Sequence, residues 1–155
     1  MNAAEPSPLA AFRMRHSLRV RWAEVDPQNI VFNGHYLTYF DIGITEYWRA
    51  IGLPYPDGIA GTGSDLFAVR SVINYHASAH FDETLEICVR AAKLGNSSMT
   101  FEMGIFRDGE RLVSGEMVYV NADPESRTSR PLPDKLRKAI AIYDVGSAAA
   151  AASGS

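Results

Sequence analysis

One helical pattern, set among strand patterns, constrains the fold of this chain more than any other feature. Between Asn33 and Ile51, apolar residues recur at helical spacing and form one broad apolar face, made of Tyr36, Tyr39, Phe40, Gly43, Tyr47 and Ile51. Gly52 and Pro54 end the pattern. A helix with such a face needs a second layer of structure to cover it.

The other patterns in the chain supply that layer. Alternation predicts a first strand over residues 12–24, with Leu18, Val20 and Trp22 on one face. After a loop over residues 54–64, four more strands are predicted over residues 67–76, 84–94, 98–107 and 111–122, and a short helix over 133–143. Turns at Gly95-Asn96 and Asp108-Gly109 favour a meander. We therefore predict an α+β fold in which an antiparallel sheet wraps around one long central helix.

The composition fits one small domain. The chain has 155 residues, of which 46% are hydrophobic and 21% charged, so it can bury a core without disulfides or metal. Cys88, the single cysteine, lies in a strand pattern and is predicted to pack in the core. We expect a flexible leader over residues 1–11, one domain over 12–144 and a disordered Ala/Gly/Ser tail over 145–155.

Charge and hydropathy exclude two classes of partner. The formal net charge of −3 argues against a general nucleic-acid-binding protein. No apolar run reaches the length of a membrane span, and the N-terminus lacks the order of a signal peptide. We therefore expect a cytoplasmic protein with no nucleic acid and no membrane as partner.

Candidate chemistry gathers where the first strand meets the helix. Asp26 lies just upstream of the helix start at Asn33-Gly34, where backbone N–H groups lack helical acceptors. A carboxylate and an amide donor that face one cleft suit the hydrolysis of an activated acyl group. From the residues alone, Asp26 equally suits the start of a turn, Asn33 a helix cap, and Glu24 a solvated strand end.

The stretch from Asp26 to Asp41, DPQNIVFNGHYLTYFD, resembles the signature of the 4-hydroxybenzoyl-CoA thioesterase-like family, which has the hot-dog fold. Weaker similarities lie at residues 81–85, 94–101 and 130–133, and the resemblance covers roughly residues 14–143. The chain departs from the pattern at Asn29, where the family often has glycine, and at Asn33, where some relatives have histidine or tyrosine. Asparagine tolerates a left-handed backbone, so the turn can form.

The resemblance implies an acyl-CoA thioesterase that releases free acid and coenzyme A. It implies that Asp26 acts as nucleophile or general base, and that the backbone N–H of Asn33, beside Gly34, polarises the thioester carbonyl. His35 is a further catalytic candidate and Tyr36 a wall of the acyl pocket, although both are also typical packing residues. No metal and no retained cofactor are expected, because coenzyme A is part of the substrate.

The phosphates of coenzyme A need polar and cationic groups at the cleft mouth. The candidates are Arg90, Lys93, Asn96, Ser97, Ser98, Arg127 and Arg130. Each also fits an exposed charge or a turn residue. The resemblance further implies a homodimer or homotetramer with the site between subunits, and such pairing would cover an open sheet edge.

Two alternatives stay open at this point. The thioester carrier could be an acyl carrier protein in place of free coenzyme A. The domain could also be a non-catalytic hot-dog module that binds acyl groups. Aryl, short-chain and medium-chain acyl groups fit the sequence equally.

Overall fold

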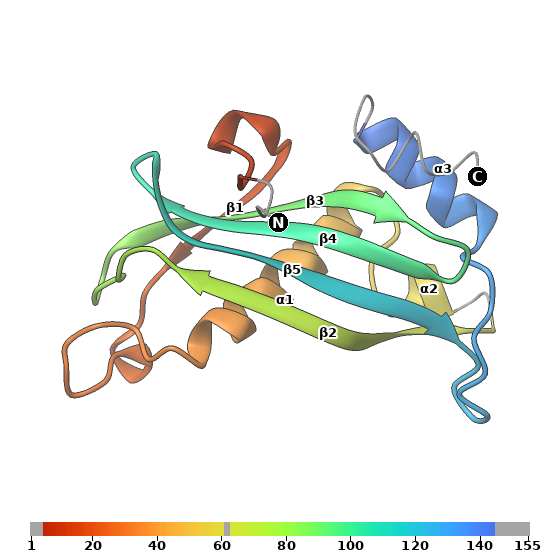
Figure 1. Ribbon diagram of the computed structural model, residues 1–155, viewed down its shortest axis with the longest axis horizontal. Coiled ribbons are helices and arrows are strands. Elements are labelled where there is room, and N and C mark those ends of the chain that lie inside the picture. The colour runs from red at the N-terminus through yellow and green to blue at the C-terminus, as the bar shows by residue number, and fades with distance from the viewer. Residues whose placement is uncertain (1–4, 61–62, 145–155) are drawn as a thin grey trace.

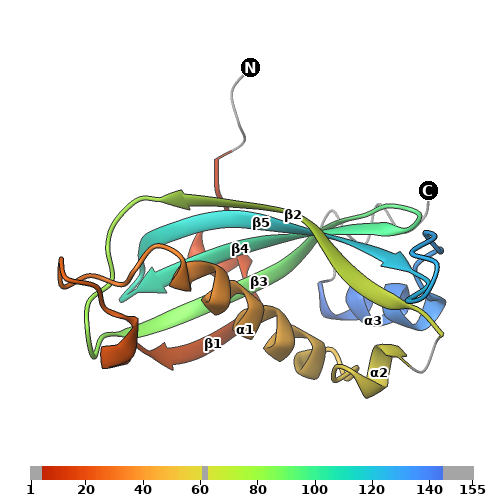
Figure 2. The ribbon, with the colours of Figure 1, turned by 90° about the horizontal axis from the view of Figure 1, so that it is seen from below.

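The computed structural model describes residues 5–60 and 63–144, and these contain one five-stranded antiparallel sheet. Its strands are β1 (Met14–Arg19), β2 (Asp65–Tyr75), β3 (Thr84–Leu94), β4 (Ser98–Arg107) and β5 (Glu110–Ala122). The long helix α1 (His35–Ala50) crosses one face, and the sheet curves around it (Figures 1 and 2). The predicted architecture of one sheet around one central helix is confirmed.

Short helices complete the fold. They are η1 (Leu9–Ala11), η2 (Trp22–Glu24), α2 (Asp57–Ala60), inside the predicted loop, and α3 (Asp134–Tyr143), which confirms the predicted final helix. Within the described part of the chain, none of the helices combines the length and apolar character that a membrane span requires.

The position of β2 differs from the predicted meander. The strand order is β1-β3-β4-β5-β2, so β2 pairs with β5 and lies at one edge of the sheet. Residues 76–83 carry the chain from this edge back to β3. Alternation of residues decides which face a side chain takes, but it does not decide which strand becomes the neighbour.

The first strand is shorter than predicted. It ends at Arg19, and Trp22–Glu24 form a 3-10 turn instead of continuing it. The carboxylate of Glu24 accepts the backbone N–H of Arg21 at 2.8 Å, which closes this turn. Trp22 consequently points outward with 70% of its surface exposed, whereas Val20 is buried.

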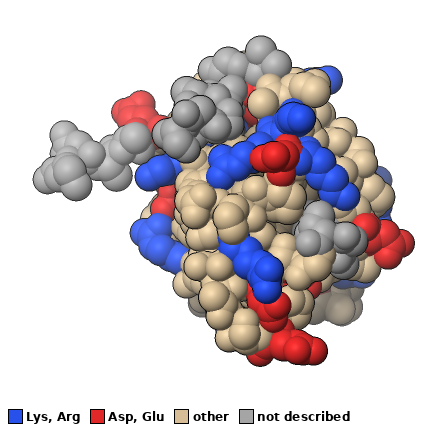
Figure 3. All heavy atoms as spheres, turned by 90° about the vertical axis from the view of Figure 1, so that its right-hand side faces the viewer, with Lys and Arg blue, Asp and Glu red and all other residues tan. Residues whose placement is uncertain are grey.

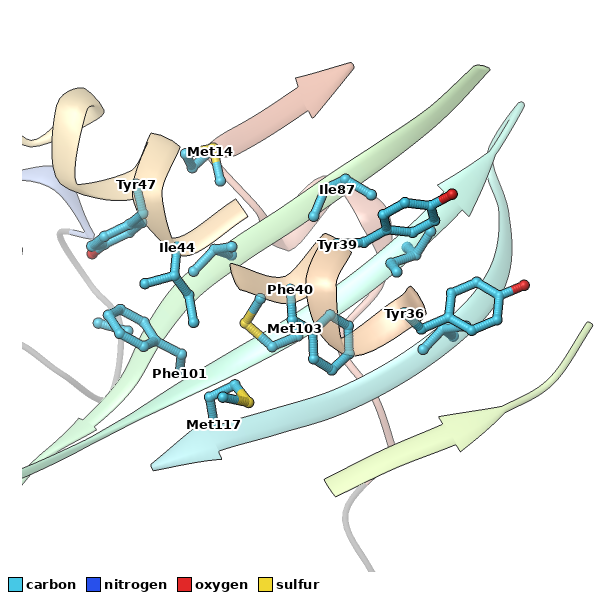
Figure 4. Packing of buried hydrophobic residues seen from close by; sticks show 14 of the residues in the cluster. Met14, Tyr36, Tyr39, Phe40, Ile44, Tyr47, Ile87, Phe101, Met103 and Met117 are labelled. Carbon is cyan, nitrogen blue, oxygen red and sulfur yellow. The ribbon is translucent and has the colours of Figure 1, made fainter. Parts of the chain in front are cut away.

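The core lies between α1 and the inner face of the sheet. Tyr36, Tyr39, Phe40 and Tyr47 are buried on the helix, as predicted, and face side chains of β3, β4 and β5 (Figure 4). The helix approaches the sheet closely at Gly43, where a Cβ atom would lie 2.7 Å from Cγ2 of Ile87. Only glycine allows this approach.

Two smaller predictions are also confirmed. Asp108 and Gly109 both have positive φ, at 49° and 82°, as a tight hairpin turn requires. Cys88 is buried against Phe12 and Phe106 in a small second cluster. Burial raises the pKa of its thiol to about 12, so Cys88 is a packing residue.

Part of the predicted flexible leader has a defined place. The N–H and Oγ of Ser7 donate to Glu102 at 2.8 and 2.7 Å, and Nη2 of Arg111 donates to the Ser7 carbonyl at 2.6 Å. Residues 5–11 therefore lie against the sheet. Residues 1–4 and the predicted tail, 145–155, fall outside the described residues.

Candidate active site

Asp26 begins a tight turn that leads the chain to α1. The N–H of Asn29 donates to the Asp26 carbonyl at 2.9 Å, and the N–H of Gln28 donates to Oδ1 of Asp26 at 2.8 Å. Asn29 has φ = 64°, so asparagine takes the left-handed conformation that the family often assigns to glycine. Asp26 itself is half-buried.

The start of α1 leaves two backbone donors unused. Gly34 is the N-cap, and no side chain caps the helix, so Asn33 does not serve as the cap. Across residues 5–60 and 63–144, no acceptor takes the N–H of Asn33 or of Gly34. The helix dipole adds partial positive charge at this point.

Asp26 and Asn33 border the same pocket, which has a volume of about 480 Å³. The other lining residues are Gln28, Ile30, Val31, Phe32, Tyr36, Tyr75, His76, Ala77 and Ser78. The hydroxyl of Tyr75 donates to the Asn33 carbonyl at 3.4 Å, and its ring lies 5.7 Å from that of Tyr36. A carboxylate and an unbonded helix-start amide therefore share one partly apolar hollow.

Tyr36 forms a wall of this pocket. Its ring is buried, and its hydroxyl accepts the N–H of Ala79 at 3.1 Å. Burial raises the pKa of Tyr36, so the hydroxyl stays protonated. His35 packs edge-on against Phe32, with 5.7 Å between ring centres, and does not line the pocket. Its catalytic role stays a prediction.

Gly34 opens onto a neighbouring groove between α1 and β2, with a volume of about 630 Å³. The groove is lined by Gly34, Leu37, Thr38, Asp41, Ala68, Val69, Arg70, Ser71, Met117 and Tyr119. Burial, helped by the charge of Asp41, raises the pKa of Tyr119 to about 12. The helix start thus lies beside two hollows, one bordered by Asn33 and one by Gly34.

Glu24 is the main difference between expectation and structure at this end of the molecule. Glu24 is only 5% exposed, whereas the sequence suggested that it lies at a solvated strand end. Burial tends to raise the pKa of its carboxyl, but hydrogen bonds from Arg21 and Tyr39 outweigh this and hold the pKa below its ordinary value. Glu24 is therefore ionised at neutral pH, and no sequence pattern indicated its burial.

Most of the predicted phosphate-binding residues gather at the opposite end of the sheet. The guanidinium of Arg127 lies 4.1 Å from the centre of the Phe67 ring, and Arg130 pairs with Asp123 at 2.9 Å. Lys and Arg side chains are numerous on this end of the molecule (Figure 3).

The predicted turn over Asn96, Ser97 and Ser98 belongs to the same end of the sheet. Arg137 donates to the carbonyl of Asn96 at 3.0 Å. The Ser97 carbonyl accepts the N–H of Asn121 at 2.8 Å, and Ser98 pairs with Val120 of β5. Arg137 was absent from the sequence candidates, because only the packing of α3 brings it to this turn.

This basic end is far from Asp26 within one chain. Arg127 covers Phe67 and Asn33 contacts Tyr75, so the two lie at opposite ends of β2. The eight residue steps from Phe67 to Tyr75 span roughly 26 Å in a strand. Lys93 is exposed one residue before the end of β3. The structure does not bring these cations to Asp26 of the same chain.

Arg90 lies elsewhere again. Its Nε donates to Oε1 of Glu102 at 2.7 Å. Val89 and Ala91 face the core, so Arg90 points to the face of the sheet away from α1. Its predicted role in phosphate binding therefore has no support from its position in one chain. Among residues 5–60 and 63–144, no three His, Cys, Asp or Glu side chains are grouped to hold a metal ion.

Comparisons with known proteins agree with this geometry. The model of the thioesterase superfamily matches residues 28–114, more than half of the chain. A thioesterase superfamily structure from Jannaschia sp. CCS1 is 25% identical, with a TM-score of 0.78, and the match covers 89% of this chain and 96% of that one. The PA5185 protein from Pseudomonas aeruginosa strain PAO1 is 28% identical, with a TM-score of 0.77 and coverage of 92% and 98%.

A third similar structure carries a ligand. It is a thioesterase from Thermus thermophilus complexed with coenzyme A and Zn, 25% identical, with a TM-score of 0.75 and coverage of 88% of this chain and 97% of that one. Family match, fold and site geometry lead to one conclusion: the chain belongs to the thioesterase superfamily, has the hot-dog fold, and is a thioester hydrolase.

Proposed function

We propose that the chain hydrolyses an acyl-CoA thioester to a free acid and coenzyme A in the pocket bordered by Asp26 and Asn33. One observation carries this proposal. Asp26, which is half-buried, and Asn33, whose backbone N–H has no acceptor among the described residues, border the same hollow of about 480 Å³ at the start of α1. The solved structure with bound coenzyme A adds support from a similar fold.

The chemistry requires few groups. The N–H of Asn33 donates to the thioester carbonyl oxygen and stabilises the negative charge that develops there. Asp26 either attacks the carbonyl carbon, forming an anhydride as the C–S bond breaks, which water then hydrolyses to the free acid and the Asp26 carboxylate, or it removes a proton from the water that attacks the carbonyl directly. The thiolate leaves readily and takes a proton afterwards, so no strong general acid is needed.

We infer that two copies pair through β2. This strand has eleven residues and pairs only with β5 among the described strands, so its other edge is open. Val69 and Tyr75 on β2 are 59% and 53% exposed. An antiparallel pair of β2 strands would join the two sheets and cover the groove beside Gly34.

Such pairing would also complete the substrate site. If the twofold axis passed near Ser71, Phe67 of one copy would lie opposite Tyr75 of the other. Arg127, which covers Phe67, would then lie near Asn33 of the partner. We therefore propose that the basic end of one copy holds the phosphates of a substrate whose acyl group lies at Asp26 of the other.

The basic end also favours the second candidate, an acyl carrier protein as the thioester carrier. A folded acidic partner would contact a broad surface, whereas coenzyme A would contact a few cations. Activity on a carrier-protein thioester should consequently fall more steeply with salt than activity on an acyl-CoA. Parallel assays from low salt to about 0.5 M separate the two carriers.

The first test is hydrolysis of a panel of aryl-CoA and graded-length acyl-CoA thioesters. Asp26→Asn should lower kcat on the order of a hundredfold or more, because it removes a group that acts on the reacting atoms. Asp82→Asn, which alters an exposed carboxylate paired with Arg19 at 3.2 Å, is the matched control and should keep its activity. A folded wild-type protein that hydrolyses no member of the panel would exclude the acyl-CoA proposal.

A further inference from the structure

Glu24 is a buried charge that the proposed chemistry leaves unused. It is 5% exposed and one of two buried carboxylates in the described part of the chain, the other being Asp144 at 7%. Burying a carboxylate is unfavourable unless its oxygens are hydrogen-bonded. The residues that hydrogen-bond to Glu24 therefore indicate which parts of the chain its buried carboxylate holds together.

These partners come from three segments. Oε1 of Glu24 accepts the N–H of Arg21 at 2.8 Å and the hydroxyl of Tyr39 at 3.0 Å, and Oε2 accepts Nη2 of Arg21 at 2.9 Å. The backbone carbonyl of Glu24 accepts the N–H of Phe32 at 3.0 Å. One residue thus joins the end of the first strand segment, the loop before α1, and α1 itself.

The two groups of the proposed reaction follow directly after these contacts. Asp26 lies two residues after Glu24, and Asn33 lies one residue after Phe32. Tyr39 is fully buried in α1, so its hydroxyl is a fixed point. Loss of the Glu24 carboxylate would free residue 24 from Tyr39, and so loosen both the segment of Asp26 and the backbone bond that Glu24 makes to Phe32. Misplacement of reacting groups by about 1 Å can cost a hundredfold in rate.

We propose that Glu24 is a positioning residue for thioester hydrolysis, which holds Asp26 and the Asn33 amide in place by tying both segments to Tyr39 of α1. This inference rests on the proposed function of Asp26 and Asn33. Glu24 is not among the residues that line the proposed pocket, and both of its carboxylate oxygens accept hydrogen bonds from Arg21 or Tyr39.

The test compares Glu24→Gln with Glu102→Gln. Glu102 is a matched control because it is also partly buried and bonded to an arginine, but it lies on the other face of the sheet. We expect Glu24→Gln to lower kcat about tenfold to a hundredfold with KM changed less than about twofold. Glu102→Gln should keep kcat, even where both variants lose similar thermal stability.

Tyr39→Phe tests the same contact in a variant that is expected to fold, in case the substitution of Glu24 prevents folding. It removes one hydroxyl and should lower kcat several-fold. Glu24→Leu has no acceptor for the Tyr39 hydroxyl and breaks the same hydrogen bond as Tyr39→Phe, so the double variant Glu24→Leu/Tyr39→Phe should lose little more activity than Glu24→Leu alone. Independent, multiplicative losses would contradict the proposed link between Glu24 and Tyr39.

Amide hydrogen exchange gives a readout that does not depend on activity. Exchange over residues 31–36 should become faster in Glu24→Gln and stay unchanged in Glu102→Gln. Unchanged kcat, a loss confined to KM, or unchanged exchange over these residues would each overturn the positioning role. If wild type hydrolyses no thioester, the proposed function fails, and the exchange comparison alone decides whether Glu24 orders this segment.

Discussion

The sheet has two ends of different construction. Where α1 begins, tight turns surround a pocket, and the carboxylates of Glu24 and Glu83 are held by Arg21 and Arg107. At the other end, exposed arginines lie at the ends of strands, as Arg127 does above Phe67 of β2. The first end offers groups in fixed positions for chemistry at one carbonyl, and the second offers positive charge that suits a flexible anion.

The anchoring of the two ends differs as well. Near the basic end, the carboxylate of Asp144 accepts the hydroxyl of Tyr47 at 2.6 Å and the N–H of Ala91 at 3.0 Å, which fixes the end of α3 to the core. Burial, with the neighbouring charge of Asp144, raises the pKa of Tyr47. Each end is therefore tied through a buried carboxylate to a buried tyrosine of α1, and at the first end Arg21 adds a charge pair to that carboxylate.

The prediction with the largest expected effect tests whether the Asp26 end of one copy and the basic end of another form one site. Asp26→Asn and the double variant Arg127→Ala/Arg130→Ala should each be impaired alone. In a dimer of the two, one site combines the intact Asp26 with intact arginines. At substrate concentrations well below KM, where both separate variants are impaired, co-expression at equal amounts should therefore restore about a quarter of wild-type activity, since half of the dimers carry one intact site of two. Activity no higher than the average of the separate variants would show that each site is built within one chain.

The double variant alone separates binding from chemistry. Removal of Arg127 and Arg130 should raise KM for a coenzyme A thioester about tenfold, because two charge-assisted contacts to phosphate are lost. The value of kcat should stay within about twofold of wild type, since neither side chain borders the pocket of Asp26 in its own chain and both would contact only the phosphates of the substrate. Steady-state kinetics checks this, with Lys135→Ala/Lys138→Ala on the exposed side of α3 as the control. A fall in kcat with unchanged KM would refute the assignment.

Tyr47→Phe should affect stability without affecting the site. It leaves the buried carboxylate of Asp144 without one of its two donors, which costs about 1–3 kcal/mol. Urea denaturation measures this, and Tyr55→Phe, whose hydroxyl is exposed, should change stability by less than about 0.5 kcal/mol. Loss of kcat in folded Tyr47→Phe would contradict the separation of the two ends.

Glu83→Gln should have the smallest effect, and that effect should depend on pH. Burial tends to raise the pKa of Glu83, but bonds from Arg107 and the N–H of His80 hold it below the ordinary value. The stabilisation, about 1 kcal/mol, is then present above an unfolded pKa of about 4.3 and is lost as pH falls through the lower folded pKa.

Thermal unfolding of Glu83→Gln and wild type should consequently differ at pH 7 and converge below about pH 4. Glu110→Gln alters the exposed partner of the same Arg107 and serves as the control, with little difference at either pH. If the difference in thermal stability between Glu83→Gln and wild type persisted unchanged at pH 3, the ionised carboxylate of Glu83 would not be the cause of that difference.

Local sequence patterns were sufficient to predict most of the helices and strands. The buried face of α1, with Tyr39, Phe40 and Tyr47, follows from residue spacing alone. Side chains about 3.6 residues apart in a helix point in the same direction. The turn at Asp108-Gly109 follows from backbone preference. The proximity of Asp26 to the start of α1 is also a local property, since only six residues separate Asp26 from Asn33.

Pairings between distant segments were decided by the tertiary structure. The edge position of β2, the burial of Glu24 beneath Tyr39, and the separation of Arg127 from Asn33 each depend on contacts between residues far apart in sequence. Alternation assigns a side chain to a face of the sheet, but the neighbour of a strand is chosen by how the whole core packs. The sequence by itself thus determined the helices and strands and the reactive segment. The tertiary structure determined which charged residues pair, because two charges far apart in sequence interact only when the fold brings their segments into contact.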